Sequence, residues 1–309
     1  MKYRKLGRTN LDVSVIGLGT WQFGGEWGKS YTQAEVNGIL DTAKSLGINL
    51  IDTAECYGDH LSEALIGQYL RASRREDWVV ATKFGHQFHS HLNRTDQYSA
   101  QEVQQQLEDS LRALQTDYID LYQFHSGPDE AFDKDDLWTM LDKQVQAGKI
   151  RHLGLSLNKK NSLHQVDSAT QINASTIQVV YNRLDQQPEE GVFPSCIRQN
   201  LGVLARVPLA SGYLSGKYKP GAVFPDNDVR KNHNPEETAD RLRKVQEIQQ
   251  NEVPEGADMA RWALAWCLKH DAVTCVIPGC KDEAQVNANA AAAELAPDDH
   301  PLSVAAPLK

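Results

Sequence analysis

The chain has 309 residues, 40% of them hydrophobic and 24% charged, which is the composition of a globular protein with a substantial core. Its 32 Lys and Arg residues against 41 Asp and Glu residues give a net charge of −9, which opposes general attraction to nucleic acid or anionic membranes. The basic residues 1–9 are not followed by the apolar core of a signal peptide or by a membrane-length apolar run. We therefore expect a cytoplasmic protein that binds neither nucleic acid nor membranes.

Eight short aliphatic or β-branched runs predict strands, and helical stretches lie between them. The predicted strands cover residues 13–18, 49–52, 78–83, 118–123, 152–156, 177–181, 202–206 and 273–278. Capping boxes at residues 32–35 and 99–102 mark helix starts between strands. This alternation is typical of parallel strands joined by crossover helices. It favours one (β/α)8 TIM barrel over residues 1–309, with an open doubly wound sheet as the alternative.

Two later segments depart from this alternation. Residues 215–251 are longer than an ordinary connection and mix Gly, Pro and charged residues before a helix predicted near residues 241–249. We expect this segment to make a long excursion over the barrel mouth. Residues 296–309 contain three prolines and are expected to form an irregular C-terminal tail that covers part of the barrel.

The five cysteines are widely spread and include no Cys-x-x-Cys pair, which predicts free thiols. Cys56 stands next to a tyrosine and beside a predicted strand end. We interpret it as a small packing residue rather than as a nucleophile.

In a barrel of this kind the active site lies at the carboxyl ends of the strands. Three neighbouring predicted strands end in Asp52, Lys83 and His125, and Tyr57 follows the first of them closely. Each side chain alone is more simply explained by capping, packing or solvent contact. Together they point into one mouth, where an unpaired charge is costly, so we expect Asp52 and Lys83 to pair.

This pairing has a chemical consequence for Tyr57. The Lys83 ammonium stabilises a phenolate and is expected to lower the phenol pKa from about 10 toward the working range, which makes Tyr57 a general acid. His125 is expected to hydrogen-bond a carbonyl oxygen and orient it toward this acid without changing its own charge. A rival hypothesis makes Lys83 a Schiff-base nucleophile, but that role needs a neutral amine, which Asp52 opposes.

The segments at residues 52–58 (DTAECYG), 81–83 (ATK) and 121–125 (LYQFH) resemble signatures of the aldo-keto reductase superfamily. Residues 17–21 (GLGTW), 148–156 (GKIRHLGLS), 208–218 (PLASGYLSGKY) and 277–279 (IPG) resemble it too, in the same order. The resemblance is greatest to the bacterial branch that is also similar to the β subunits of potassium channels. It implies an oxidoreductase that reduces aldehydes or ketones to alcohols by hydride transfer from NADPH, with Tyr57 as the acid. A regulatory subunit that binds NADPH with little turnover is the alternative.

The mode of cofactor binding also follows from the resemblance. No Gly-x-Gly-x-x-Gly fingerprint joins a strand to a helix, so a Rossmann arrangement is not expected. The resemblance implies an extended cofactor across the barrel mouth. The residues assigned to it are Thr20, Trp21, Asp52, Ser156, Asn158, Gln178, Arg206, Pro208, Leu209, Ala210, Gly212, Lys217, Arg230, Gly279, Lys281, Gln285 and Asn289. Lys217, Arg230 and Lys281, the last at a predicted helix start, form a basic cluster suited to a 2′-phosphate, which favours NADPH over NADH.

Three positions depart from the family pattern. Arg206 stands where most relatives carry an aromatic residue that stacks on nicotinamide, and three roles stay open for it: stacking, contact with the pyrophosphate, or contact with an anionic group of the substrate. Leu157 replaces the usual amide-binding Asn, and Asn158 is expected to substitute for it. Near the adenine, Ala288 replaces the usual Glu.

Aromatic side chains are expected to line the substrate pocket. The predicted pocket residues are Trp21, Trp27, Tyr57, Phe84 and His125, together with His86 and Phe88. They suit a flat or apolar carbonyl compound as the small-molecule partner, and the oligomeric state stays open. His86, His89 and His91 lie in a predicted loop that supplies no Cys or carboxylate ligand, so no metal site is expected.

Overall fold

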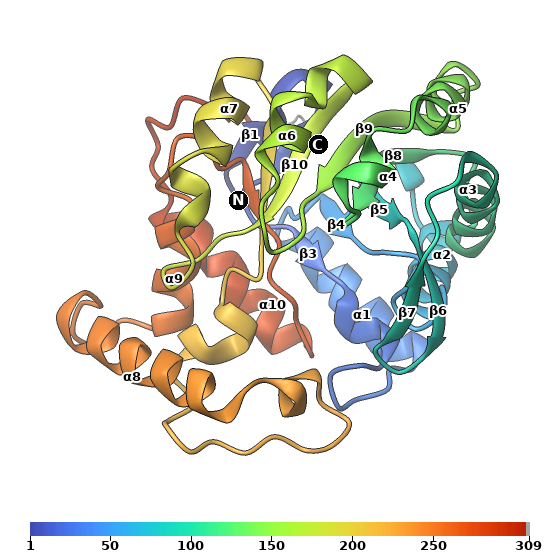
Figure 1. Ribbon diagram of the computed structural model, residues 1–309. Helices are drawn as coiled ribbons and strands as arrows, with labels where there is room; N and C mark the ends of the chain where they lie inside the picture. Colours follow the sequence, from blue (N-terminus) through green and yellow to red (C-terminus); the bar gives the residue numbers. More distant parts are fainter. Residues whose placement is uncertain (307–309) are drawn as a thin grey trace.

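The computed structural model describes residues 1–306 and contains an eight-stranded parallel sheet in the order β12-β11-β10-β9-β8-β5-β4-β3. Its strands are β3 (Leu18–Gly19), β4 (Leu50–Asp52), β5 (Val79–Phe84), β8 (Ile119–His125), β9 (Ile150–Ser156), β10 (Ala174–Val180), β11 (Gly202–Arg206) and β12 (Cys275–Val276). Parallel bridges from Ile16 to Val276 and from Gly19 to Gly279 join the two edges of the sheet. The sheet is therefore closed, and the predicted (β/α)8 barrel is confirmed (Figure 1).

Glycine is required at the point of closure. A Cβ at Gly19 would lie 2.7 Å from the carbonyl oxygen of Ile277, closer than real Cβ contacts come. The backbone of Gly19 instead approaches the neighbouring chain closely, and its N–H donates to the carbonyl of Pro278 at 3.0 Å. This glycine brings the first and last barrel strands together.

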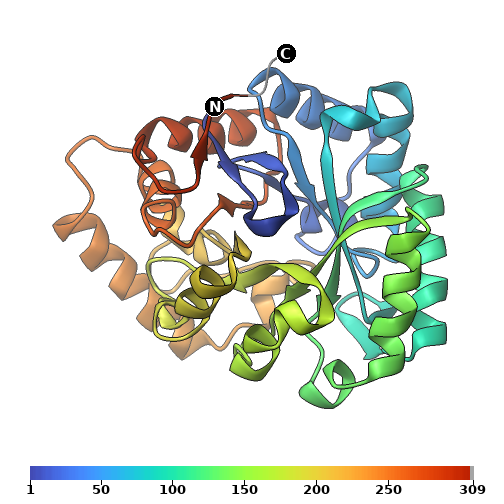
Figure 2. The same cartoon turned by 90° about the horizontal axis from the view of Figure 1, so that it is seen from above.

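Helices surround the barrel on its outer side (Figures 1 and 2). They are α1 (Gln33–Ser45), α2 (Leu61–Ala72), α3 (Ala100–Leu114), α4 (Asp129–Phe132), α5 (Asp135–Gln146), α6 (Leu163–Asp167), α7 (Val192–Gln199), α8 (Pro235–Asn251), α9 (Met259–Cys267) and α10 (Glu283–Ala290). Short 3-10 helices are η1 (Gly7–Thr9), η2 (Trp21–Gly24), η3 (Arg75–Asp77), η4 (Ala169–Ile172), η5 (Gln187–Glu189), η6 (Ala210–Ser215), η7 (Val229–Asn232) and η8 (Ala291–Leu295). Both predicted capping boxes are present, at Thr32 before α1 and at Ser99 before α3. Apolar faces of these helices pack on the outer face of the sheet and form the largest hydrophobic core.

The amino-terminal segment corrects the first predicted strand. Residues 13–18 do not form one strand, because β2 (Asp12–Ser14) pairs antiparallel with β1 (Tyr3–Lys5), and the chain joins the barrel only afterwards. Leu6 and Val13 of this hairpin pack with Leu50, Leu121 and other side chains inside the barrel. The hairpin therefore covers the amino-terminal end of the barrel, as the view in Figure 2 shows.

The C-terminal tail is more regular than predicted. Within it, β13 (Ser303–Val304) pairs antiparallel with β1, which adds a third strand to the amino-terminal sheet. A two-residue strand among prolines carries too little periodicity to be recognised in the sequence. Residues 307–309 of the predicted tail lie outside the described residues.

A β-hairpin replaces the predicted loop after β5. Strands β6 (His86–Ser90) and β7 (Asn93–Asp96) pair antiparallel, with Leu92 at a φ of 57° in the turn between them. Most of the hairpin is polar and exposed, so it lacks the apolar alternation that predicts a strand. Figure 1 shows it extending beyond the carboxyl ends of the barrel strands.

The long segment after β11 also lies on the carboxyl-end side of the barrel (Figure 1). It passes through η6, an extended stretch and η7 into α8, which is longer than the helix predicted at residues 241–249. Tyr213, Phe224, Leu242 and Met259 belong to a second hydrophobic cluster that holds this segment in place. The segment brings Lys217, Tyr218 and Arg230 to the main cavity.

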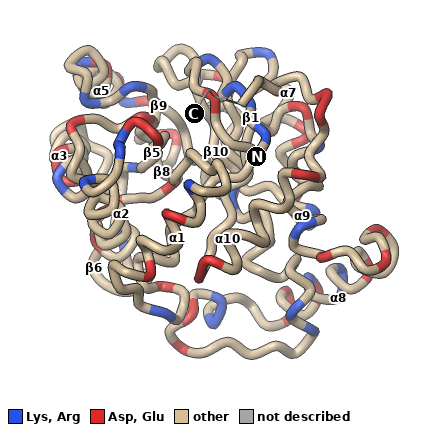
Figure 3. Tube along the Cα trace, turned by 180° about the vertical axis from the view of Figure 1, so that it is seen from behind, with Lys and Arg blue, Asp and Glu red and all other residues tan. Residues whose placement is uncertain are grey.

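Charged residues of both signs are interspersed over the surface, for example along α3 and α8 in Figure 3. In the part of the chain that the structure describes, no helix has the length and apolarity that crossing a membrane requires.

Candidate active site

A cavity of about 490 Å³ opens at the carboxyl ends of the barrel strands. This volume is in the range of small-molecule sites. Most of the predicted site residues line it: Thr20, Trp21, Trp27, Asp52, Tyr57, His125, Gln178, Arg206, Pro208, Leu209, Gly212, Lys217, Arg230, Gly279, Lys281, Gln285 and Asn289. The structure thus brings residues from nearly the whole length of the chain to one cavity.

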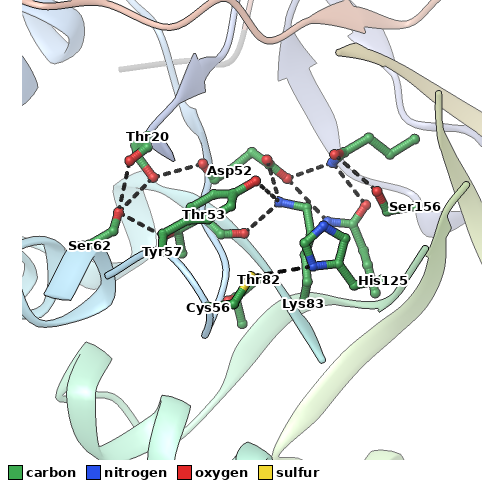
Figure 4. Close-up of polar contacts among 12 residues, drawn as sticks. Thr20, Asp52, Thr53, Cys56, Tyr57, Ser62, Thr82, Lys83, His125 and Ser156 are labelled. Carbon is green, nitrogen blue, oxygen red and sulfur yellow. Dashed lines mark hydrogen bonds and ion pairs between the residues drawn. The ribbon is translucent and has the colours of Figure 1, made fainter. Parts of the chain in front are cut away.

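The predicted pair of Asp52 and Lys83 is present beneath the cavity (Figure 4). Lys83 Nζ, fully buried at the end of β5, donates to Asp52 Oδ1 at 2.7 Å and to the carbonyl of Thr53 at 2.7 Å. Burial alone lowers the pKa of Lys83, but Asp52 and Tyr57 raise it, and the net pKa lies above its ordinary value. Lys83 is therefore an ammonium ion, which argues against the Schiff-base hypothesis.

Two amides complete the environment of Asp52. Its Oδ2 accepts hydrogen bonds from Gln178 Nε2 at 2.6 Å and from Gln123 Nε2 at 3.2 Å. Ser156 in turn donates to Gln178 Oε1 at 3.3 Å. The buried carboxylate is thus paired and fully hydrogen-bonded, as a charge in a protein interior must be. Gln123 lies within the LYQFH segment at residues 121–125 but was not assigned to the site, because an amide on a strand has no obvious part in the reaction.

Tyr57 lies above this pair, and its hydroxyl accepts a hydrogen bond from Lys83 Nζ at 3.2 Å. Burial raises the pKa of Tyr57 to about 12, although Lys83 lowers it and Asp52 raises it further. The predicted net lowering is therefore wrong, while the predicted sign of the Lys83 contribution is correct. The reason is desolvation, which disfavours phenolate more than one paired ammonium favours it. At neutral pH Tyr57 carries its proton.

Close backbone packing holds Tyr57 in position. Gly58 has a φ of 69°, and a Cβ there would lie 2.6 Å from the carbonyl oxygen of Gly24 in η2. The indole of Trp21, also in η2, stacks on the Tyr57 ring with centroids 5.9 Å apart. Trp27 meets Trp21 edge to face at 5.3 Å. The predicted aromatic wall therefore exists on this side of the cavity.

His125 ends β8 beside Tyr57, with ring centroids 6.4 Å apart. Burial lowers its pKa well below the ordinary value, and the nearby His86 and Lys83 lower it further. The imidazole is neutral at pH 7, as predicted for a group that orients substrate without a change of charge. Its Nδ1 lies 3.8 Å from Cys56 Sγ (Figure 4).

Arg206 lines the cavity at the end of β11. One of its terminal nitrogens donates to the carbonyl of Leu157 at 3.0 Å, while its Nε is buried and has no hydrogen-bond partner among the described residues. Burial lowers its pKa, and Tyr57 and Asp52 raise it. The Arg206 guanidinium therefore contacts the backbone of Leu157, the residue that replaces the amide-binding Asn. Two of the three departures from the family pattern, Arg206 and Leu157, are thus in direct contact.

The opposite end of the cavity is basic, but less so than predicted. Lys217 and Lys281 line it and form no ion pair within residues 1–306. Arg230 differs, because its Nε and a terminal nitrogen donate to both oxygens of Asp228 at 2.9 and 2.7 Å. Its charge is therefore already compensated. This bidentate pair escaped prediction because two residues so close in sequence face each other only where Asp228 caps η7, the short helix that contains Arg230.

The helix at this end begins later than expected. α10 starts at Glu283 with Asp282 as its N-cap, and the Asp282 carboxylate accepts the backbone N–H of Gln285 at 2.8 Å. The backbone N–H of Lys281 donates to Gln285 Oε1 at 2.9 Å. The backbone N–H groups of Lys281 and Gln285 thus already have partners, while the side chains of Lys281 and Lys217 remain available to a phosphate at this end of the cavity.

Some predicted residues do not line the cavity. Phe84 was assigned to the substrate pocket, but it packs outside the barrel against Tyr122 and Phe124, with ring centroids 4.8 and 5.9 Å away. Neighbouring strand residues point to opposite faces, and because Lys83 points inward, Phe84 points outward. Phe88 lines a separate pocket behind the hairpin.

The other residues outside the lining are Lys83, Ser156, Asn158 and Ala210. Lys83 and Ser156 act from beneath through Tyr57 and Gln178, and Ala210 is buried within η6. Asn158 accepts the backbone N–H of Lys160 at 2.9 Å in the loop after β9. The expected substitution for the amide-binding Asn is therefore not seen in this geometry.

The hairpin adds a part of the site that sequence reasoning missed. Arg94 on β7 lines the cavity, pairs with the buried Glu26 and donates to the carbonyl of Cys56. Glu26 also accepts a hydrogen bond from the indole of Trp21. The contacts from Arg94 through Glu26 to Trp21 connect the β6–β7 hairpin to η2. They could not be predicted, because the polar sequence of the hairpin did not reveal that β6 and β7 pair.

The aldo/keto reductase family model matches residues 15–303. The chain belongs to the aldo/keto reductase family. Among characterised sequences, the aldo-keto reductase YhdN of Bacillus subtilis is 34% identical over 243 residues, covering 76% of this chain and 70% of YhdN. The aldo-keto reductase yakc [NADP(+)] of Schizosaccharomyces pombe is 30% identical, covering 90% of this chain and 82% of the relative. The predicted family is thus confirmed, and the likeness to channel subunits stays a prediction.

Solved structures support the same assignment. The holo form of the aldo-keto reductase AKR11C1 from Bacillus halodurans has a TM-score of 0.79 at 32% identity, with 95% of this chain and 91% of that chain covered. The glycerol dehydrogenase AKR11B4 from Gluconobacter oxydans has a TM-score of 0.79 at 27% identity, with 94% and 90% covered. The chain is therefore an oxidoreductase-family protein with the barrel of that family.

Proposed function

We propose that this protein reduces aldehydes or ketones to alcohols with NADPH, and that Tyr57 is the general acid. The observation that carries the proposal is the contact of the Tyr57 hydroxyl with Lys83 Nζ at 3.2 Å, inside a cavity that also contains a neutral imidazole. A protonated phenol beside a buried ammonium is a proton donor whose conjugate base is stabilised at once. Glycerol oxidation, named for the relative AKR11B4, is the reverse of the same chemistry.

The residues of this chain divide the work as follows. NADPH, held by residues such as Gln178 and Lys281, would supply the hydride that the carbonyl carbon takes up. Tyr57 gives its proton to the carbonyl oxygen, so that the carbonyl group becomes an alcohol and Tyr57 becomes a phenolate. Lys83 stabilises that phenolate across 3.2 Å, and Asp52 keeps Lys83 in place through the 2.7 Å ion pair. Solvent returns the proton to Tyr57.

His125 holds the substrate in this scheme. As a neutral imidazole it has one N–H, which donates to the carbonyl oxygen and directs it toward Tyr57. Trp21 and Trp27 cover the reacting end of the cavity with apolar surface and limit the access of water. The partner that fits this wall is a small carbonyl compound with a flat or apolar part.

The residues present fit a dinucleotide cofactor. Gln178 at one end offers an amide for a nicotinamide carboxamide, and Gln285 and Asn289 at the other offer amides for an adenine. Lys217 and Lys281, which have no ion-pair partner within residues 1–306, favour the extra phosphate of NADPH over NADH. The unpartnered Nε of Arg206 supports a contact with the cofactor between these ends.

We place this reaction in the cytoplasm. All five cysteines are free and buried, which fits a reducing compartment. The proposal includes no nucleic-acid or membrane partner.

The test is to measure NADPH and NADH oxidation by the purified protein against a panel of aldehydes and ketones, with cofactor affinity measured separately by tryptophan fluorescence. We expect turnover with NADPH for at least one carbonyl class and weaker use of NADH. Tight NADPH binding without turnover across the panel would favour a regulatory subunit instead. Absence of binding for both cofactors would overturn the proposal.

A further inference from the structure

Three side chains meet beside the active site, and the proposed reaction assigns a role to only one of them. They are Glu55, Cys56 and His125, and one potential ligand atom from each lies within 4.8 Å of the other two. Cys56 Sγ and His125 Nδ1 are 3.8 Å apart and point toward one another in Figure 4. In a tetrahedral zinc site with bonds of roughly 2.0–2.3 Å, ligand atoms lie roughly 3.5 Å apart. Small side-chain rotations therefore suffice to place a metal ion between them.

Glu55 supplies the second, independent observation. Its side chain is buried, with 3% of the residue exposed. Oε1 accepts the backbone N–H of His86 at 3.0 Å, but Oε2 is buried without any hydrogen-bond partner in the described chain. An orphaned carboxylate oxygen in the interior is costly, so each such atom calls for an explanation. A cation bound next to it would supply the missing partner.

We propose that Glu55, Cys56 and His125 form a binding site for a thiophilic divalent ion such as Zn²⁺, and that its occupation inhibits the protein. Thiolate, imidazole and carboxylate are the ligands that zinc takes in proteins. Both Cys56 and His125 line the main cavity, which provides an entry path and room for a water as fourth ligand. The sequence predicts no metal site, because neither the cysteine spacing nor His86, His89 and His91 form a ligand motif, and Glu55 and His125 come together only in the fold.

The electrostatic surroundings permit a cation here. Arg94 is paired with Glu26, and Lys83 is paired with Asp52, so two neighbouring positive charges are already compensated. His125 is neutral, which leaves its ring free to act as a ligand at pH 7.

Inhibition follows from the shared use of His125, and this part of the inference rests on the proposed function. A metal bound to His125 Nδ1 fixes the orientation of the ring, and the ion with its bound water occupies space at the reacting end of the cavity, where the substrate carbonyl would lie. The metal site itself does not depend on the identity of the reaction, so binding and inhibition are measured separately.

The first experiment measures binding. Co²⁺ is titrated into the purified protein, and Zn²⁺ is then added as competitor. We expect a thiolate-to-cobalt charge-transfer band at one equivalent, its loss on addition of Zn²⁺, and at least about 10-fold weaker Zn²⁺ binding in Cys56→Ala and in Glu55→Gln. Cys280→Ala is the matched control, because Cys280 is also a buried free thiol but does not line the cavity. A band of equal strength in Cys56→Ala, or no band in the wild type, would overturn the site.

The second experiment measures inhibition. NADPH oxidation is followed as Zn²⁺ is raised, with each variant compared with its own metal-free rate. Loss of activity in the wild type and in Cys280→Ala, with at least about 10-fold resistance in Cys56→Ala, supports the proposal. Unchanged activity at saturating Zn²⁺ would contradict the inhibitory role. Failure of the proposed function is recognised separately, because it abolishes turnover without metal and leaves the cobalt spectrum intact.

Discussion

The two ends of the cavity are built differently. At the catalytic end, Asp52, Lys83 and His125 stand on barrel strands, and the Asp52–Lys83 pair is cross-bonded to Tyr57 and to two amides. At the other end, Lys217 and Lys281 stand outside the strands and have no ion-pair partner in residues 1–306. Side chains that are hydrogen-bonded to one another on rigid strands keep reacting groups in a fixed geometry, whereas unpaired charges on loops attract a charged ligand. Under the proposed function, the first end carries the reaction and the second end determines which cofactor binds.

The largest effect is expected from breaking the buried pair. Lys83→Met leaves the Asp52 carboxylate uncompensated in the barrel, and such a change costs about 3–5 kcal/mol in the free energy of unfolding. Urea denaturation measures it. Lys44→Met is the control, because Lys44 pairs with Asp77 at the surface, where an ion pair contributes at most about 1 kcal/mol. Equal losses in the two variants would remove the distinction between a buried network and an ordinary ion pair.

The cationic end should respond in affinity rather than stability. If Lys281 binds the 2′-phosphate as proposed, Lys281→Ala removes one hydrogen bond from an ammonium to a phosphate, a contact of about 1.5–3 kcal/mol, so NADPH binding should weaken roughly 10- to 100-fold. NADH binding should stay nearly unchanged. Fluorescence titration measures both, with Lys143→Ala on α5 as the control. Equal weakening for the two cofactors would show that Lys281 does not select for the 2′-phosphate.

The neutral state of His125 predicts a dependence of stability on pH. Its pKa is depressed in the folded protein, so below about pH 6.5 the unfolded chain binds a proton that the folded chain does not, and stability falls as pH falls. His125→Asn should remove up to about 2 kcal/mol of the difference in unfolding free energy between pH 7 and pH 5. His164→Asn is the control, because Asp133 raises the pKa of His164 and its contribution to the pH dependence of stability therefore has the opposite sign. A parallel pH dependence of wild type and His125→Asn would show that this imidazole protonates freely.

The smallest effect concerns salt. At 0.1 M ionic strength, interactions between exposed or partly exposed charges are largely screened beyond about 10 Å. Raising NaCl from about 0.05 to 0.2 M should therefore weaken NADPH binding by about a few-fold, while kcat at saturating cofactor stays constant. Stopped-flow and steady-state assays at matched salt concentrations separate the two quantities. A fall in kcat with constant affinity would reverse the roles assigned to the two ends.

The difference between the ends also explains what the sequence could predict. Asp52, Lys83 and His125 follow aliphatic strand runs, so the regular geometry of a parallel barrel brings them together, and their pairing follows from the cost of isolated charges. Phe84 was wrongly assigned to the substrate pocket because the alternation of side chains between the two faces of a strand was not applied to it.

Contacts outside the barrel strands could not be predicted in this way. The Arg230–Asp228 pair and the link from Arg94 to Glu26 depend on a short 3-10 helix and a polar hairpin, neither of which leaves a periodic apolar signal. The pKa of Tyr57 was misjudged for a related reason, because burial, its largest cause, is a property of the folded packing.

The most direct test of the central claim is to compare Tyr57→Phe with the wild type in kcat/KM and in NADPH affinity. A positioned general acid contributes about 10²- to 10⁴-fold, so kcat/KM should fall by that factor while the dissociation constant for NADPH stays the same. Tyr218→Phe, at the cationic end of the same cavity, should keep the catalytic rate. Full activity in Tyr57→Phe would contradict the assignment of Tyr57 as the acid.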